Sequence, residues 1–252
     1  QMENLRKMLI AMSKDIRVLG HDSQFTIKAD RQKTPPWGLF GGQPGLPGVI
    51  TIYPGTDQDV LRNVSFHVKR GQTLGIVGRT GAGKTTLACL LARIYAPDSG
   101  EILLGGKNIA KIKKGEFERV VSLVRDEAVL FRGTIRENLV TEGEVSEEKI
   151  EEVLKSLDLY DKVFSQKLGL NHQINDNSTL FSQSEKQLFA LARVILKEPQ
   201  IIIFDSAFNS MSSRQKKKVF KIIQECFADK TCIFFCDPGA DVPFECKEIK
   251  MK

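Results

Sequence analysis

Long hydrophobic runs, paired cysteines and histidines are all scarce in this sequence, and each shortage excludes a class of function. No run of 18 apolar residues occurs among the 252 residues, so we expect neither a membrane-spanning segment nor a cleavable signal. Four of the five cysteines lie at positions 226, 232, 236 and 246, without a C-x-x-C pair or a nearby histidine. That spacing argues against zinc and favours reduced core thiols in a cytosolic protein.

The charge of the sequence also gives little indication of nucleic-acid binding. The net charge is +6, and the basic clusters are short: one lies at residues 111–114 and another at residues 216–218. Neither cluster is interleaved with aromatic residues, so we interpret both as solvated helix faces and predict no nucleic-acid partner. The alternative is contact with nucleic acid or lipid headgroups. The 41% hydrophobic content suffices for one large α/β domain, alone or with an appendage.

Two regions differ in composition. Residues 3–19, "ENLRKMLIAMSKDIRVL", place apolar residues at helical spacing, which predicts an amphipathic helix ending near Gly20. Residues 34–48, "TPPWGLFGGQPGLPG", are dense in Pro and Gly and predict a linker. We therefore place a domain boundary between residues 1–48 and residues 49–252.

The second region alternates strands and helices. Short β-like runs ("GVITIY", "VSFHV", "TLGIVG", "EILLGG") come first, and residues 127–197 are mainly helical in pattern. Strands return at "IIIFD" and "TCIFFCD", around a basic helix at residues 212–228. This order predicts an α/β fold with a helical insertion and no internal repeat.

A complete phosphate-binding motif lies within this region. "GRTGAGKT" matches G-x-x-x-x-G-K-[ST], follows the apolar strand "TLGIV" and opens a helix. Glycines let backbone N–H groups approach phosphates, Lys84 would reach the β and γ phosphates, and Thr85 would bind Mg²⁺. The predicted nucleotide-binding residues here are Gly78, Arg79, Thr80, Gly81, Ala82, Gly83, Lys84, Thr85 and Thr86.

Asp205 is the expected partner of this loop. It ends the apolar run of residues 201–204, which predicts a buried strand next to the glycine-loop strand, with the carboxylate directed at the metal. The alternative is a core strand that happens to end in Asp. The intact glycine loop favours the metal ligand.

Several segments resemble the nucleotide-binding domain of ABC proteins, especially exporters of the C subfamily. The resemblance covers residues 49–250 and includes "VLRNVSFHVKRGQTLGIVGRTGAGKTTL", "SGEILLGGKNI", "LFRGTIRENL" and "QLFALARVILKEPQIIIFD". It implies a P-loop NTPase cassette with a mainly parallel core sheet, an antiparallel β subdomain and a helical subdomain at about residues 127–197. It also implies ATP and Mg²⁺ as cofactors, a second nucleotide-binding domain and transporter transmembrane domains as partners, and a cytoplasmic location at the membrane face.

Three further positions carry over from that family with different fidelity. Tyr53 corresponds to an aromatic residue that stacks on adenine, although a core tyrosine fits equally well. Asp126 stands at the Mg²⁺-sensing glutamine and is a candidate metal ligand. Ser182 keeps the serine of the signature segment, which faces the partner's ATP.

The positions associated with hydrolysis depart from the family pattern. Ser184 and Glu185 replace the signature glycine and glutamine, and a carboxylate there would repel a γ-phosphate. Ser206 replaces the catalytic glutamate, and Asp237 stands at the switch histidine. Ser212 replaces the aspartate of the dimer-contact loop. No histidine follows position 172, and no glutamate lies between positions 198 and 225, so a small change of register restores neither group.

Hydrolysis needs a base or orienting group on the attacking water, whereas binding needs only the loop and the metal. We therefore expect ATP binding with weak or absent hydrolysis. The alternatives are an active ATPase in which other residues substitute, and a regulatory or structural cassette that does not depend on ATP. Soluble ABC proteins of DNA repair or translation fit less well, because their coiled-coil insertion and paired cassettes are not visible.

The first 48 residues resemble other families over short stretches. Residues 3–19 are similar to a helix of guanosine tetraphosphate synthetase/hydrolase proteins, and the Gly-rich stretch is similar to hydantoinase-B-type proteins. Neither stretch carries a catalytic set, and the pair His21 and Asp22 lacks a metal-site context. A helix plus a linker is the simplest interpretation, and a mosaic sequence is the alternative.

Overall fold

The computed structural model describes residues 25–28, 49–52, 59–64, 66–97, 100–175, 179–240 and 247–251. The helix expected at residues 3–19, the linker at residues 34–48 and Tyr53 lie outside these residues. The predicted boundary between residues 48 and 49 therefore stays a prediction.

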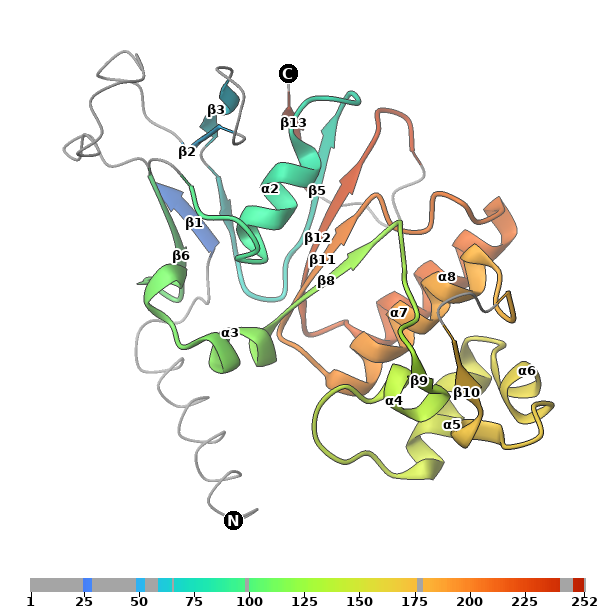
Figure 1. Cartoon of the computed structure of the whole chain (residues 1–252). Coiled ribbons are helices and arrows are strands. Elements are labelled where there is room, and N and C mark those ends of the chain that lie inside the picture. The colour runs from blue at the N-terminus through green and yellow to red at the C-terminus, as the bar shows by residue number, and fades with distance from the viewer. Residues whose placement is uncertain are drawn as a thin grey trace.

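A five-stranded parallel sheet forms the centre of the fold (Figure 1). Its order is β13-β5-β12-β11-β8. The strands are β5 (Thr73–Gly78), β8 (Val121–Arg125), β11 (Ile201–Asp205), β12 (Thr231–Cys236) and β13 (Lys247–Met251). Purely parallel sheets are covered on both faces, and the unbroken burial of β11 agrees with that rule.

One prediction about this sheet was wrong. We expected the strand that ends in Asp205 to lie next to the glycine-loop strand, but β12 separates the two. Ile233 of β12 pairs with Leu74 of β5 on one side and with Ile203 of β11 on the other. Neighbours in a parallel sheet are set by the crossover helices, and the residues within a strand do not specify them.

The two faces of the sheet belong to different hydrophobic clusters. Ile201 and Ile203 pack in a cluster with α2 (Lys84–Leu91), whereas Ile202 and Phe204 pack with α7 (Gln183–Lys197) and α8 (Ser213–Cys226). Side chains of successive strand residues point to opposite faces, so each face receives every second residue. In Figure 1, α2 lies on one side of the sheet, and α7 and α8 lie on the other.

Smaller elements surround this core. One antiparallel sheet has the order β4-β1-β6-β7, and two-stranded sheets pair β2 with β3 and β9 with β10. The strands are β1 (Phe25–Lys28), β2 (Val49–Ile52), β3 (Asp59–Val64), β4 (His67–Val68), β6 (Glu101–Leu104), β7 (Lys107–Asn108), β9 (Gly133–Thr134) and β10 (Gln173–Ile174). The helices are η1 (Ile109–Lys111), α3 (Lys114–Val120), α4 (Ile135–Leu139), α5 (Glu147–Ser156), α6 (Tyr160–Phe164) and η2 (Gly169–Asn171).

Local sequence explains where the long helices begin. Ser182 and Ser212 each cap a helix N-terminus, and the side chain three residues later bonds back to the cap, which forms a capping box. These helices confirm the helical pattern of "SEKQLFALARVILKE" at residues 184–198 and the basic helix expected at residues 212–228. The mixed architecture, with a mainly parallel core sheet, small antiparallel sheets and a helical region, confirms the predicted α/β class. Within the described residues, no helix is long and apolar enough to span a bilayer.

Candidate nucleotide-binding site

The glycine loop connects β5 to α2 and needs glycine at specific positions. Gly81 and Gly83 have φ angles of 85° and 84°, a conformation that other residues adopt only with strain. A Cβ atom on Gly83 would also lie 2.5 Å from a methyl carbon of Leu61. Gly83 caps α2 without a side-chain hydrogen bond, so the cap itself supplies no side-chain acceptor to the first turn. That arrangement suits an anionic ligand at the helix N-terminus.

Lys84 is buried at the base of this loop. Its Nζ donates to the carbonyl oxygen of Gly78 at 2.6 Å, to that of Arg79 at 2.9 Å and to Oδ1 of Asp237 at 2.9 Å. An ammonium group has three N–H donors, and these three acceptors account for them. Lys84 therefore holds the loop to the segment that follows β12.

Thr85 and Asp205 meet across the sheet edge. The Thr85 hydroxyl donates to Oδ1 of Asp205 at 3.2 Å, although 120 residues separate them. Asp205 is 4% exposed, and Nε of Arg125 lies 3.9 Å from its other oxygen. Burial raises the pKa of Asp205, and the contacts with Thr85 and Arg125 oppose that rise.

This pair fits a magnesium ion chemically. Mg²⁺ prefers oxygen ligands and is commonly held by one or two protein groups together with water and substrate phosphates. A hydroxyl and a carboxylate at this separation supply such oxygens. Among the described residues, no cluster of three or more His, Cys, Asp or Glu side chains could hold a metal ion. Mg²⁺ bound with a nucleotide takes further ligands from phosphates and water.

Asp126 lies near this pair but is held by α7. Nε2 of Gln187 donates to the Asp126 carbonyl oxygen at 2.8 Å and also to its carboxylate. The amide oxygen of Gln187 accepts from the Ser210 hydroxyl at 3.1 Å. Sequence reasoning missed Gln187, which is fully buried. Its position four residues before Leu191, on the apolar stripe of the helix, was the available signal.

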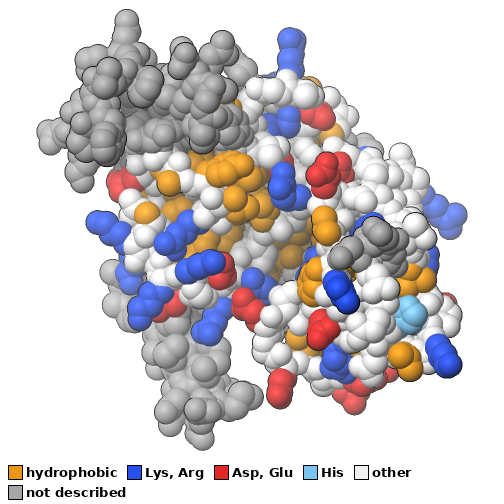
Figure 2. All heavy atoms as spheres, viewed as in Figure 1, with side chains coloured by type: hydrophobic (Ala, Val, Ile, Leu, Met, Phe, Trp, Pro, Cys, Tyr) orange, Lys and Arg blue, Asp and Glu red, His pale blue; other side chains and the backbone are white. Residues whose placement is uncertain are grey.

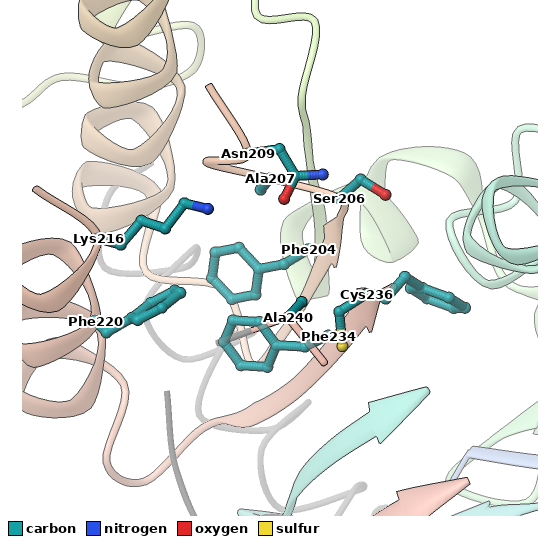
Figure 3. Close-up of a pocket in the computed structure, with 10 residues that line it drawn as sticks. Phe204, Ser206, Ala207, Asn209, Lys216, Phe220, Phe234, Cys236 and Ala240 are labelled. Atoms are coloured by element: carbon teal, nitrogen blue, oxygen red, sulfur yellow. The ribbon is translucent and has the colours of Figure 1, made fainter. Parts of the chain in front are cut away.

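Ser206 follows β11 and occupies a constrained backbone position. Its φ angle is 51°, and its N–H donates to the carbonyl oxygen of Phe235 at 3.1 Å. A small pocket opens beside it at the ends of β11 and β12. Figure 3 shows Ser206 and Asn209 at one side of this pocket, with Lys216 and Phe220 of α8 at another. Ser206 therefore lies at the sheet edge where Asp205 and Asp237 also emerge.

The signature segment is tied into its own helix. The Ser182 hydroxyl accepts from the N–H of Glu185, and the Glu185 carboxylate accepts from the N–H of Ser182 at 2.7 Å. Nζ of Lys162 lies 2.8 Å from the same carboxylate. Burial favours a higher pKa for Glu185, but Lys162 and Ser182 outweigh it and lower that pKa. The charge that we expected to repel a phosphate is thus paired within the chain.

The loop residues differ in exposure. Gly78 and Thr86 are buried, Arg79, Thr80 and Gly81 are exposed, and Ala82 is half-buried with its N–H donating to the Arg79 carbonyl oxygen. The structure brings Lys84, Thr85, Asp205 and Asp237 together, whereas the contacts of Ser182 are with the first turn of α7.

Comparisons with known proteins identify the family. The ABC transporter family model matches residues 61–209, more than half of the chain. The chain belongs to the ABC transporter family. ABC transporter C family member 3 of Dictyostelium discoideum is 32% identical over 207 residues, which cover 82% of this chain and 15% of that protein. The mitochondrial iron-sulfur clusters transporter ABCB7 of Rattus norvegicus is 36% identical over 178 residues, which cover 70% of this chain and 24% of that protein.

The ABC cassette thus spans less than a third of the length of these two relatives. A solved structure of a bacterial Atm1-family ABC exporter with ATP bound aligns with it at a TM-score of 0.72 and 24% identity. The alignment covers 92% of this chain and 40% of that one, and it shows a shared fold. A second family model, hydantoinase B/oxoprolinase, matches residues 10–84 and overlaps the ABC match over residues 61–84.

Proposed function

We propose that this ABC cassette binds Mg-ATP and dimerises with a partner cassette to drive transport, with impaired hydrolysis at its own site. The contact between Thr85 and Asp205 carries the proposal, because it joins the loop and the metal carboxylate in one place. Lys84 would hold the β and γ phosphates, and the backbone of the glycine loop would surround them. Thr85 and Asp205 would hold Mg²⁺, which neutralises charge on the phosphates, and Asp126 is a further candidate ligand.

The hydrolytic side of the proposal rests on Ser206 and Asp237. A serine hydroxyl cannot take a proton from water near neutral pH without an activating group, and loss of a positioned base costs about 10²–10⁴-fold in rate. Asp237 carries a negative charge beside Lys84 where a neutral or cationic histidine would favour the γ-phosphate. ATP that binds would therefore be hydrolysed more slowly than in a competent site.

The partners follow from the family. A second nucleotide-binding domain would supply a signature segment to this loop, and Ser182 would face the partner's ATP. Transmembrane domains would place the cassette at the cytoplasmic face of a membrane and select the substrate. In this proposal residues 49–252 form the cassette, residues 127–197 its helical subdomain and residues 1–48 an N-terminal extension. Tyr53 would stack on adenine.

The proposal includes no nucleic-acid partner. In Figure 2, basic and acidic side chains are interspersed over the described part of the face shown. Affinity for nucleic acid requires basic side chains aligned along a phosphate backbone. The described part of this face does not show that alignment.

Calorimetry with ATP tests the binding half, with and without Mg²⁺. We expect binding below millimolar ATP that Mg²⁺ strengthens, and no binding at millimolar ATP would contradict it. Phosphate release, measured alone and beside a competent partner cassette, tests the hydrolytic half. Steady release by this chain that Lys84→Ala abolishes would show an active ATPase instead.

One observation favours a second candidate, a regulatory cassette that does not depend on ATP. All three donors of Lys84 have acceptors within the chain, so the loop is stabilised without nucleotide. This candidate predicts that partner binding is unchanged by Lys84→Ala and by removal of ATP. A pull-down of the partner cassette with and without ATP separates the two candidates.

A further inference from the structure

We propose that Asp237 competes with the phosphates of ATP for Lys84 and thereby sets the nucleotide affinity of the site. The inference rests on the proposed function, because competition requires a nucleotide that binds. It goes beyond the loss of a histidine: the residue at this position acts as an anion of the protein itself, bound to the lysine that the phosphates need.

The contact is an ion pair with a hydrogen bond. Nζ of Lys84 lies 2.9 Å from Oδ1 of Asp237, a distance typical of a charge-assisted bond. The other two N–H donors of Lys84 point to backbone carbonyls of the loop. A phosphate oxygen that binds Lys84 must therefore replace Asp237 or a loop carbonyl.

The sheet explains why Asp237 reaches this lysine. Strand β12 lies between β5 and β11, and Cys236 pairs with Val77 in register. Asp237 is the next residue, so it emerges level with Gly78, where the glycine loop begins. The central position of β12 thus delivers the carboxylate to the loop, although 153 residues separate Asp237 from Lys84.

Exposure identifies Asp237 as the partner that can be displaced. The side chain of Lys84 is 8% exposed, whereas that of Asp237 is 50% exposed. Water can solvate the carboxylate when it leaves, but Lys84 stays buried and needs an anion. If Asp237 stays in place, its charge repels the incoming phosphates. Either route lowers the affinity for ATP.

The test is equilibrium binding of ATP by the full chain, measured by calorimetry. Asp237→Asn and Asp237→Ala remove the negative charge, and we expect each to raise ATP affinity by about fivefold, as for a half-exposed ion pair. Asp237→Glu keeps the charge, so its affinity should stay within about twofold of the unmodified chain.

Asp229→Asn is the matched control. Asp229 precedes β12 as Asp237 follows it, so the two residues flank opposite ends of one strand. The Asp229 side chain is 74% exposed and pairs with Lys230 at 3.1 Å. This control removes one negative charge without altering the loop, and its ATP affinity should not change. Urea unfolding of each ligand-free variant verifies that it folds.

The outcomes separate this inference from the proposed function. Higher ATP affinity in Asp237→Asn and Asp237→Ala, but not in Asp229→Asn, supports the competition. ATP binding that is equal or weaker in both Asp237 variants overturns it while leaving the proposed function intact. Binding only by the Asp237 variants would support the competition and contradict ATP binding by the unmodified chain. If no variant binds ATP, both proposals fail.

Discussion

Two groups of residues at the carboxyl ends of the parallel strands differ: the binding half, which follows β5, and the hydrolytic half, which follows β11 and β12. At the end of β5, the glycine loop and the first turn of α2 carry Lys84 and Thr85, which we propose bind phosphate and metal. At the ends of β11 and β12 stand Ser206 and Asp237, where we propose that the groups acting on water are missing. The two halves lie side by side, yet they come from strands far apart in the sequence.

If the proposed function holds, this difference would let hydrolysis be lost while binding is kept. The loop depends on backbone conformation at Gly81 and Gly83, so most substitutions there would strain the chain. At the other two positions, the backbone N–H of Ser206 donates to Phe235 and the side chain of Asp237 accepts from Lys84. In the proposed function, a change of side chain at a strand end would therefore remove a catalytic group without disturbing the fold.

The largest expected effect comes from breaking the binding half. Lys84→Ala removes the cation that would hold the β and γ phosphates and leaves Asp237 without its partner. Truncation of one member of a desolvated charge pair costs about 2–5 kcal/mol, so loss of the pair between Lys84 and the phosphates should lower ATP affinity by about 100-fold. Calorimetry measures the ATP affinity.

Lys114→Ala is the control for that prediction. Lys114 lies on α3, its side chain is 84% exposed, and its partner Glu118 is 3.7 Å away. The same truncation at this surface site should leave ATP affinity unchanged. Equal ATP affinities for Lys84→Ala and Lys114→Ala would mean that Lys84 has no special part in ATP binding.

Restoring the hydrolytic half is the second prediction. Ser206→Glu combined with Asp237→His returns a base and a histidine to the ends of β11 and β12. A positioned base contributes about 10²–10⁴-fold, and imperfect placement should still raise turnover at least about tenfold. Phosphate release at saturating ATP, beside a competent partner cassette, measures this turnover.

The same double variant in a Lys84→Ala background is the control, because it retains the new groups but loses the binding half. Release should return to the level of the unmodified chain. A double variant that binds ATP but releases phosphate no faster would show that hydrolysis needs more than the groups at positions 206 and 237.

Local sequence predicted much of this arrangement. The glycine loop between a strand and a helix, the helices that begin at Ser182 and Ser212, and the buried strand that ends in Asp205 all have short-range signals. These signals are turns, caps and apolar periodicity, which act over a few residues. The contact between Thr85 and Asp205 also follows once both belong to one sheet edge.

Long-range pairing could not be predicted in the same way. The order of β5, β12 and β11 depends on crossovers, and no residue within these strands specifies it. The bond between Lys84 and Asp237 depends on that order, because β12 carries Asp237 to the loop. The pairing of Glu185 with Lys162 joins α7 to α6, and the sequence of neither helix alone predicts it.

A third prediction concerns the metal side of the binding half. Asp205→Asn should weaken Mg²⁺ binding in the presence of ATP by about tenfold.

The same variant should also change how stability depends on pH. Burial raises the pKa of Asp205, so the unmodified ligand-free chain loses stability as pH rises from about 3.9 through that raised pKa. The variant lacks this loss, so it should be the more stable protein at pH 7 and gain nothing below pH 3.9. Urea unfolding across pH, with magnesium titration at fixed ATP, measures both effects.

The smallest expected effect lies in the signature segment, which the chain has tied into its own fold. Glu185→Gln keeps a residue suited to the capping box with Ser182 but removes the charge that pairs with Lys162. The lowered pKa of Glu185 means that its ionised form stabilises the fold above about pH 4.3, and that this contribution is lost as pH falls through the lowered pKa. We therefore expect the variant to lose about 1 kcal/mol of unfolding free energy at pH 7, and the difference from the unmodified chain should close at acidic pH.

Glu152→Gln is the control. The Glu152 side chain is 72% exposed and pairs with Lys149 at 3.4 Å, so this variant should lose far less unfolding free energy. Equal losses in the two variants, or a gap that widens on acidification, would mean that the signature segment is not held by this pair.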